Sequence, residues 1–120
     1  MLWLRVFQIN DVYELDNFAS FYTLVHSKTT EADEYGNTPD KTLVVLSGDF
    51  LAPSLLSSLD KGASMIDVLN KCGVTHVCFG NHECDVPMPA LKKRIQSSNF
   101  TWINSNMQEL NAVLEGTHTP

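Results

Sequence analysis

The chain has 120 residues, of which 43% are hydrophobic, 18% charged and 9% aromatic, and this size and composition predict one modest globular domain and exclude a disordered or fibrous chain. The formal net charge of -6 argues against nucleic acid and anionic membranes as partners, because both would repel an acidic protein surface. No apolar stretch is long enough for a signal peptide or a membrane span, so we expect a cytoplasmic protein.

The first third of the chain predicts a strand, a helix and a long loop. Residues 2–9, LWLRVFQI, combine aliphatic, aromatic and β-branched side chains and end at a turn-favouring Asn-Asp pair, which predicts a strand. From Asp16, a candidate N-cap, apolar residues recur at spacings of three and four to about residue 28, which predicts an amphipathic helix. Residues 28–41 have almost no aliphatic side chains, so we expect a surface loop there.

The middle of the chain predicts a second strand, two helices and a third strand. The unbroken apolar run 43–46 precedes a Ser-Gly-Asp turn and predicts a strand that is buried on both faces. Residues 51–62 predict a short helical turn and residues 63–71 a helix, each closed by a glycine. Residues 74–80, VTHVCFG, predict the third strand.

The last third predicts a helix over 90–97, after two prolines, and a fourth strand within 100–107. Strands that alternate with helices through long crossovers favour a mostly parallel sheet and an α/β class. The three cysteines fit neither a disulfide framework nor a CxxC zinc or redox pair, so we expect free thiols; they are Cys72, Cys78 and Cys84.

Each predicted strand ends in a polar cluster, and in a parallel sheet these ends meet at one edge, where ligands bind. The clusters are Asn10-Asp11, Ser47-Gly48-Asp49, Gly80-Asn81-His82-Glu83 and Asn104-Ser105-Asn106. A single Asp after a strand is usually only a turn former or a helix cap. Gathered at one edge, however, these side chains predict a site for chemistry.

The residue types in these clusters suit divalent metals and proton transfer. The carboxylates of Asp11 and Asp49 are ligands for hard or borderline cations, and an aspartate between two metals can bridge them. Asn81 offers an amide oxygen, and the His82 imidazole can ligate a metal, donate a proton or bind an anionic oxygen. Asp85, three residues further on, is placed to orient that imidazole and raise its proton affinity.

In this order and at these intervals, NDVYEL (10–15), SGDF (47–50) and GNHECD (80–85) resemble the first three sequence blocks of the calcineurin-like metallophosphoesterases. LNKCGVTHVCFG (69–80) and TWINSNM (101–107) favour the 5'-nucleotidase branch of that family. The resemblance implies half of a four-layer αββα sandwich. Residues 1–107 would form the N-terminal half of the catalytic domain, and 108–120 a tail or truncated continuation.

The resemblance also implies a hydrolase of phosphoric ester bonds. Such enzymes use two divalent metal ions, drawn from Zn, Mn, Mg and Fe, to activate water against a small phosphorylated substrate, here a nucleotide phosphomonoester. Carried over, Asp11 would bind the first metal, Asp49 would bridge both, and Asn81 would bind the second. His82 and Asp85 would form the catalytic dyad that stabilises the phosphoryl transition state.

Two departures from the family pattern leave an alternative open. Tyr13 stands where the family has a histidine, and a phenol is a poor ligand for Zn²⁺, Mn²⁺ or Mg²⁺, although a ferric ion would accept a phenolate. The family's later histidine ligands have no counterpart after residue 107. We therefore expect a fragment of a longer enzyme, with a non-catalytic metal- or nucleotide-binding relative as the alternative. For Glu83, within the third block, we expect a structural role.

Overall fold

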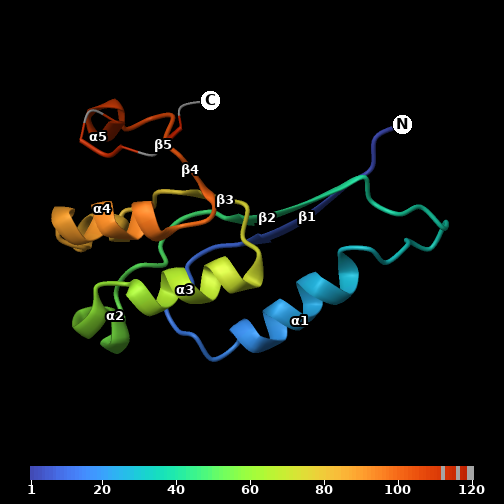
Figure 1. The fold of residues 1–120 in the computed structure, drawn as a ribbon, viewed down its shortest axis with the longest axis horizontal. Helices are drawn as coiled ribbons and strands as arrows, with labels where there is room; N and C mark the ends of the chain where they lie inside the picture. Colours follow the sequence, from blue (N-terminus) through green and yellow to red (C-terminus); the bar gives the residue numbers. More distant parts are fainter. Residues whose placement is uncertain (112, 116, 119–120) are drawn as a thin grey trace.

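The computed structural model describes residues 1–111, 113–115 and 117–118, and helices alternate with strands along the chain (Figure 1). The elements are β1 (Leu4–Ile9), α1 (Phe18–Lys28), β2 (Lys41–Leu46), α2 (Leu55–Asp60), α3 (Ala63–Cys72), β3 (His76–Cys78), the 3₁₀ helix η1 (His82–Asp85), α4 (Met88–Ser97), β4 (Thr101–Ile103), α5 (Gln108–Asn111) and β5 (Thr117–His118). The strands form a 5-stranded sheet in the order β1-β2-β3-β4-β5. Every described pairing is parallel, which confirms the predicted α/β class.

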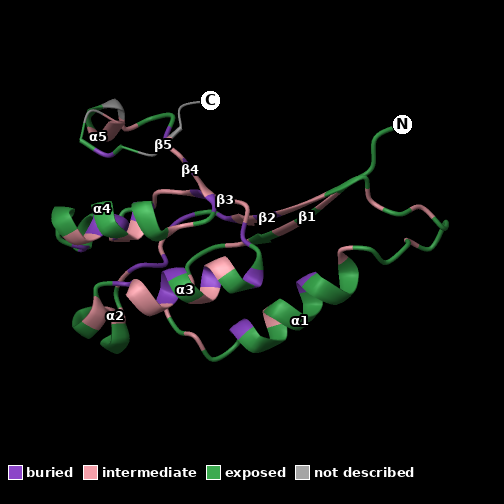
Figure 2. Ribbon diagram, viewed as in Figure 1, coloured by how far each residue is buried: buried purple, intermediate pink, exposed green. Residues whose placement is uncertain are grey.

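The helices α1, α3 and α4 lie together on one side of the sheet (Figure 1). Strands that follow one another in both sequence and space need crossovers of the same right-handed sense, and these place every connecting helix on the same face. Alternate strand residues are accordingly buried beneath the helices; they are Val44, Leu46, Val77 and Trp102. Figure 2 marks the buried residues of α3 in purple and the mostly exposed residues of α1 in green.

The second face of the sheet differs from the expectation for β2. The unbroken apolar run predicts burial on both faces, but Leu43 and Val45, which point away from the helices, are only half-buried. No helix of the described part of the chain covers that face, so the prediction is wrong for this side of β2.

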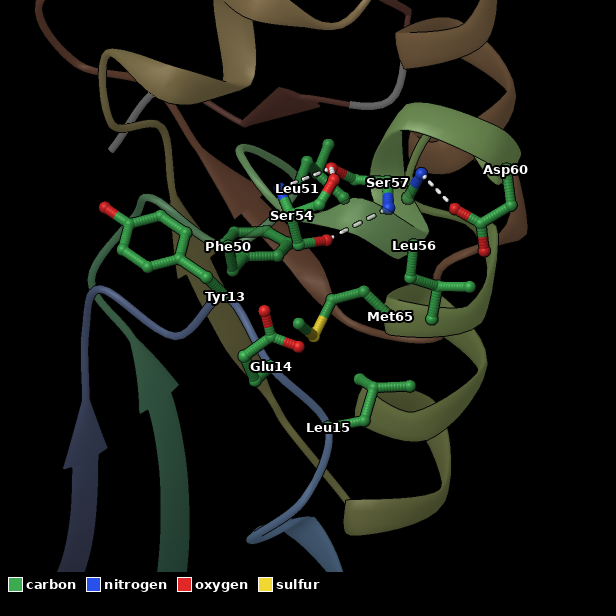
Figure 3. Close-up of a pocket in the computed structure, with 11 residues that line it drawn as sticks. Tyr13, Glu14, Leu15, Phe50, Leu51, Ser54, Leu56, Ser57, Asp60 and Met65 are labelled. Atoms are coloured by element: carbon green, nitrogen blue, oxygen red, sulfur yellow. Dashed lines mark hydrogen bonds between the residues drawn. The ribbon is translucent and has the colours of Figure 1, made fainter.

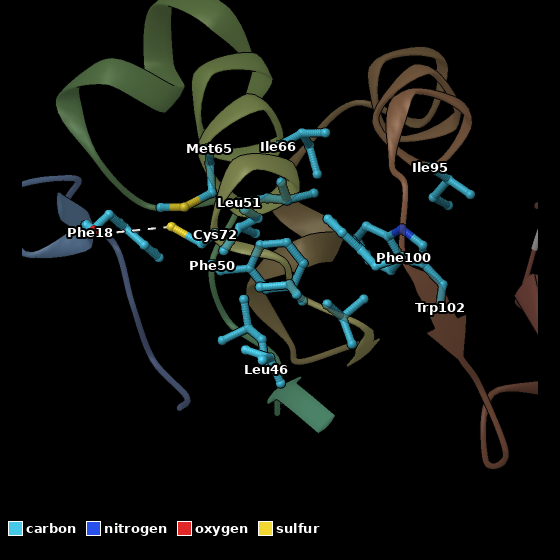
Figure 4. Close-up of a cluster of buried hydrophobic side chains, with 14 of the residues drawn as sticks. Phe18, Leu46, Phe50, Leu51, Met65, Ile66, Cys72, Ile95, Phe100 and Trp102 are labelled. Carbon is cyan, nitrogen blue, oxygen red and sulfur yellow. Dashed lines mark hydrogen bonds between the residues drawn. The ribbon is translucent and has the colours of Figure 1, made fainter. Parts of the chain in front are cut away.

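The core forms between the sheet and the helices around Trp102, which is fully buried (Figure 4). Its ring centroid lies 5.4 Å from Phe50, 4.8 Å from Phe79 and 6.0 Å from Phe100. The indole N–H donates to the hydroxyl of Ser98 at 3.1 Å, which satisfies the one polar atom of the ring. Helices α3 and α4 complete the cluster with aliphatic side chains that include Ile66, Leu69, Leu91 and Ile95.

Local capping explains the start of α2 and the end of α3. Helix α2 begins after Ser54, whose hydroxyl accepts the backbone N–H of Ser57 in a reciprocal capping box. Helix α3 ends at Gly73, where the backbone is left-handed with φ 75°, as predicted. Helix α1 begins at Phe18, one residue later than an N-cap at Asp16 would place its start. Its N-cap is Asn17, and no side chain caps it.

The segment 108–120, predicted as a tail or truncated continuation, contains α5 and β5 in its described residues. Strand β5 pairs with β4 through Trp102↔Thr117 and Ile103↔His118, and Leu114 is buried in the core. The described part of this segment therefore extends the same sheet, while the domain boundary at residue 107 remains a prediction.

Two further expectations concern thiols and membranes. Cys72, Cys78 and Cys84 are all free, as predicted. Among the described residues, no helix has the length and apolar character needed to span a bilayer.

Replacing Trp102 with Ala should lower the free energy of unfolding by about 3–5 kcal/mol, because the missing indole leaves a cavity among three aromatic rings. The matched control is Trp3→Ala, since Trp3 is 41% exposed; its loss should be about 1 kcal/mol or less. Urea unfolding followed by far-UV circular dichroism measures both. Equal losses for the two variants would contradict the central position of Trp102.

Candidate functional site

The loops after β1 and β2 run side by side beyond Ile9 and Leu46, the last paired residues of these two strands. The backbone N–H of Asp11 donates to the carbonyl of Gly48 at 3.2 Å, and that of Val12 donates to the carbonyl of Asp49 at 3.1 Å. Asp11 and Asp49 have positive φ values of 54° and 56°, a left-handed backbone that aspartate tolerates better than most residues. The two aspartates therefore follow neighbouring strands at the same edge of the sheet.

Two glycines let the loops after β2 and β3 approach each other closely. A Cβ on Gly48, whose φ is 90°, would lie 2.6 Å from the backbone N of Gly80. A Cβ on Gly80 would lie only 2.1 Å from Oδ1 of Asp49, so the Asp49 carboxylate rests on a backbone that carries no side chain. The same Oδ1 accepts the backbone N–H of His82 at 2.8 Å.

Glu83 is 0% exposed, and its carboxylate joins the same two loops. Oε1 accepts the backbone N–H groups of Phe50 at 2.8 Å and Leu51 at 3.1 Å. Oε2 accepts those of Asp49 at 2.9 Å and Gly80 at 2.6 Å. Because a buried loop has to satisfy its N–H donors, this acceptor-only group has the structural role that the sequence predicts for Glu83.

His82 and Asp85 form a hydrogen-bonded pair on η1. Nδ1 of His82 lies 2.7 Å from Oδ2 of Asp85, since residues three apart on a 3₁₀ helix share one face. This hydrogen bond raises the pKa of His82 above its ordinary value against a smaller opposing effect of burial, and the charges of Asp85, Asp49 and Glu83 raise it further. No hydrogen bond to Nε2 occurs within the described residues, so this nitrogen remains available to bind an anionic oxygen.

Tyr13 lies between Asp11 and His82. Its hydroxyl donates to Oδ1 of Asp11 at 3.1 Å, and its ring meets the imidazole edge-on, with centroids 5.9 Å apart at 89°. Burial, followed by the hydrogen bond to Asp11 and the charges of Asp11, Asp49 and Glu83, raises the pKa of the Tyr13 hydroxyl. Tyr13 is therefore a neutral hydrogen-bond donor at physiological pH. The side-chain amide of Asn10 donates to Oδ2 of Asp11, so both carboxylate oxygens of Asp11 have donors.

The other side of the Tyr13 ring borders a small pocket, whereas its hydroxyl points away from that pocket (Figure 3). Phe50, Leu51 and Met65 belong to the apolar part of the lining, with the Ser54 capping box beside them. The space open to the centre of a water molecule is about 20 Å³, which is enough for a single molecule. It is too small to hold a substrate.

The remaining predicted residues fall into two groups. Asn81 is exposed and precedes η1, where its carbonyl accepts the N–H of Cys84 at 3.3 Å, so its amide is accessible at the edge. Asn104, by contrast, is buried, and its side-chain amide donates to the carbonyl of Met107 and to Asn111, each at 2.8 Å. The fourth polar cluster, Asn104-Ser105-Asn106, thus stabilises the turn in which it lies. Among the described residues, no hydrogen bond joins it to the other three clusters.

The donors at this edge have the chemistry of a metal site but are few. Among the described residues, no group of three or more His, Cys, Asp and Glu side chains is arranged to hold a metal ion. The carboxylates of Asp11 and Asp49 with the Asn81 amide form an oxygen-rich set that suits hard or borderline divalent cations. Because even a tetrahedral ion takes four ligands, these residues fit a metal by type and supply only part of its coordination.

Comparison with known proteins identifies the fold. No protein-family model and no curated protein matches the sequence. A 5'-nucleotidase precursor from Thermus thermophilus matches 98% of the chain with a TM-score of 0.73 at 16% identity. A proposed 5'-nucleotidase from Staphylococcus aureus, in complex with alpha-ketoglutarate, matches 86% with a TM-score of 0.63 at 17% identity.

These matches confirm the predicted fold, the N-terminal part of the 5'-nucleotidase metallophosphoesterase architecture. At such identities the likeness concerns the fold alone. The chain spans about a quarter of the length of these proteins, 25% of the first and 22% of the second.

Replacing Asp85 with Asn should lower the pKa of His82, because the imidazolium loses both its carboxylate partner and a nearby negative charge. Histidine Cε1–H resonances followed by NMR across a pH series measure the pKa directly. Asp67→Asn is the control: it removes an exposed carboxylate from α3 and should leave the pKa of His82 unchanged. An unaltered pKa in Asp85→Asn would contradict the pairing.

Proposed function

We propose that this chain contributes part of the active site of a metal-dependent phosphoesterase, most similar to a 5'-nucleotidase, that hydrolyses a nucleotide phosphomonoester. The observation that carries the proposal is the contact of Asp49 with His82, in which Oδ1 accepts the His82 N–H at 2.8 Å. The contact joins a candidate metal ligand to a candidate phosphate-binding side chain. It lies at the carboxyl edge of a parallel sheet, where ligands bind in such folds.

Asp11, Asp49 and Asn81 are the residues that would hold two divalent ions of Zn, Mn, Mg or Fe, with Asp49 between them. When bound, such ions lower the pKa of a coordinated water and neutralise charge on the transferred phosphoryl group. Oδ2 of Asp49 has no hydrogen bond within the described residues, so it is available for this purpose. The remaining ligands would belong to other parts of a longer protein.

His82 is the residue that we assign to the phosphoryl group. Asp85 holds Nδ1 at 2.7 Å, which leaves Nε2 to donate to an anionic oxygen. The raised pKa of His82 favours the imidazolium form, and a charged donor binds a phosphoryl oxygen more strongly than a neutral one. In a chain of net charge -6, this positive group also reduces repulsion of an anionic substrate.

The second candidate is a relative that binds a metal or nucleotide without catalysis. Tyr13 favours it, because its hydroxyl donates to the Asp11 oxygen that a first metal would need. Metal content and phosphate release, measured on one purified protein that contains this chain together with the remaining ligands, separate the two functions. Divalent metal with hydrolysis supports the enzyme, and binding without phosphate release supports the alternative.

Replacing Asp49 with Asn should weaken Mn²⁺ binding by more than about 100-fold, because a neutral amide takes the place of the proposed bridging carboxylate. Metal-dependent phosphate release from AMP should fall to background. Isothermal titration calorimetry and a phosphate assay measure these quantities. The Asp67→Asn protein should behave like the wild type. Unchanged Mn²⁺ binding and turnover in Asp49→Asn would rule out the bridging role.

Replacing His82 with Asn should lower kcat by about 10²–10³-fold, since the transition state loses one charged donor. Bound metal should remain at the wild-type level. The matched control is His26→Asn, because His26 is exposed on α1 and stacks on Tyr22. Loss of metal from the His82→Asn protein would instead identify this imidazole as a ligand.

A further inference from the structure

The loops after β2 and β3 are joined by two carboxylates that act in opposite directions. Glu83, after β3, accepts N–H groups from Asp49, Phe50 and Leu51 after β2. Asp49, after β2, accepts the N–H of His82 after β3. We call these two carboxylates and the N–H groups that they bind the reciprocal lock.

The Glu83 carboxylate is excluded from direct chemistry. Its side chain is 0% exposed, and each oxygen already accepts two backbone N–H groups. Neither a metal nor a substrate can reach it without breaking the lock. Any influence of Glu83 on the site has to pass through the residues that it holds.

Asp49 is the residue through which such an influence can act. Its φ of 56° is left-handed, a conformation less favourable than the right-handed one even for aspartate, so the contacts that hold it matter. The bond of 2.9 Å from its N–H to Oε2 of Glu83 is one such contact, and this backbone places the side chain against Gly80. If that bond is lost, Asp49 can relax to a more common conformation and its carboxylate can leave the edge.

We propose that Glu83 is the positioning residue of the site, which fixes the carboxylate of Asp49 and, through it, the backbone of His82. The part of this inference that concerns metal affinity rests on the proposed function. The part that concerns geometry does not.

Glu83→Gln is the decisive variant. The amide keeps one acceptor oxygen but turns its NH₂ group toward two backbone N–H donors, so two of the four bonds of Glu83 are replaced by donor–donor contacts. The matched control is Asp60→Asn. The carboxylate of Asp60 also binds two backbone N–H groups, those of Gly62 and Ser64, each at 2.8 Å, but at the start of α3.

Amide hydrogen exchange of the metal-free chain, measured by NMR, tests the geometry. The His82 N–H donates to Asp49 and not to the Glu83 carboxylate, so a merely structural role would change its exchange only as much as that of core amides such as Val77. In Glu83→Gln we expect the ratio of the His82 amide exchange rate to the Val77 amide exchange rate to be at least about tenfold higher than in the wild type. In Asp60→Asn this ratio should stay at the wild-type value. An unchanged ratio in Glu83→Gln overturns the positioning role.

Mn²⁺ titration by calorimetry, at a temperature where circular dichroism shows both proteins folded, tests the consequence. The dissociation constant should rise by about 10–100-fold in Glu83→Gln, as for other residues that orient metal ligands. An unchanged constant overturns this consequence and leaves the proposed function standing. A wild-type protein that contains this chain with the remaining ligands and still binds no Mn²⁺ overturns the proposed metal-dependent function instead, and hydrogen exchange still decides the positioning role.

If Glu83→Gln does not fold, the wild-type chain provides the test. Under mild denaturant, the backbone amides of the reciprocal lock should open together, so that hydrogen exchange gives the same free energy of opening for each of them. These amides are those of Asp49, Phe50, Leu51, Gly80 and His82. A His82 amide that opens independently of the others overturns the inference.

Discussion

The Glu83 carboxylate accepts four backbone N–H groups from the loops after β2 and β3, and the geometry of the candidate site depends on this contact. A parallel sheet leaves the loops beyond its strand ends without ladder partners, and a buried N–H group needs an acceptor. A carboxylate supplies several acceptor positions from one side chain. It therefore holds the two loops close enough that only glycines fit at positions 48 and 80.

Negative charge is concentrated at this edge and contributes to the protonation of the neighbouring groups. Burial first raises the pKa of Tyr13, and the hydrogen bond to Asp85 that of His82; the charges of Asp49 and Glu83 raise both pKa values further. Tyr13 consequently remains a neutral donor, while His82 tends toward its cationic form. An acidic edge of this kind attracts cations, which is the electrostatic basis for proposing metal ions there. An ion at Asp11 would have to displace the Tyr13 hydroxyl from one carboxylate oxygen or the Asn10 amide from the other.

In the described part of the chain, only one face of the sheet is covered by helices. Helices α1, α3 and α4 cover one face (Figure 1), and the described residues place no helix on the other, where Leu4 and Val6 are 51% and 52% exposed. Exposed apolar residues along a sheet face usually pack against a further layer. The matching 5'-nucleotidase structures are about four times as long as the chain.

The sequence by itself determined the order of strands and helices up to β4, the parallel sheet and the edge at which three of the four polar clusters lie, because hydrophobic periodicity and turn residues act locally. It also paired His82 with Asp85, since a separation of three residues places both on one helical face. Only the tertiary structure decided that Asn104 folds its own turn, that Tyr13 donates to Asp11, and that Glu83 binds the backbone of Asp49. The contact of Glu83 with Asp49 joins residues 34 positions apart, so it follows from how the loops after β2 and β3 pack and from no local pattern. The contacts of Tyr13 and Asn104 are short-range, but local residue types allow a donor at these positions several partners, and only the folded backbone selects one.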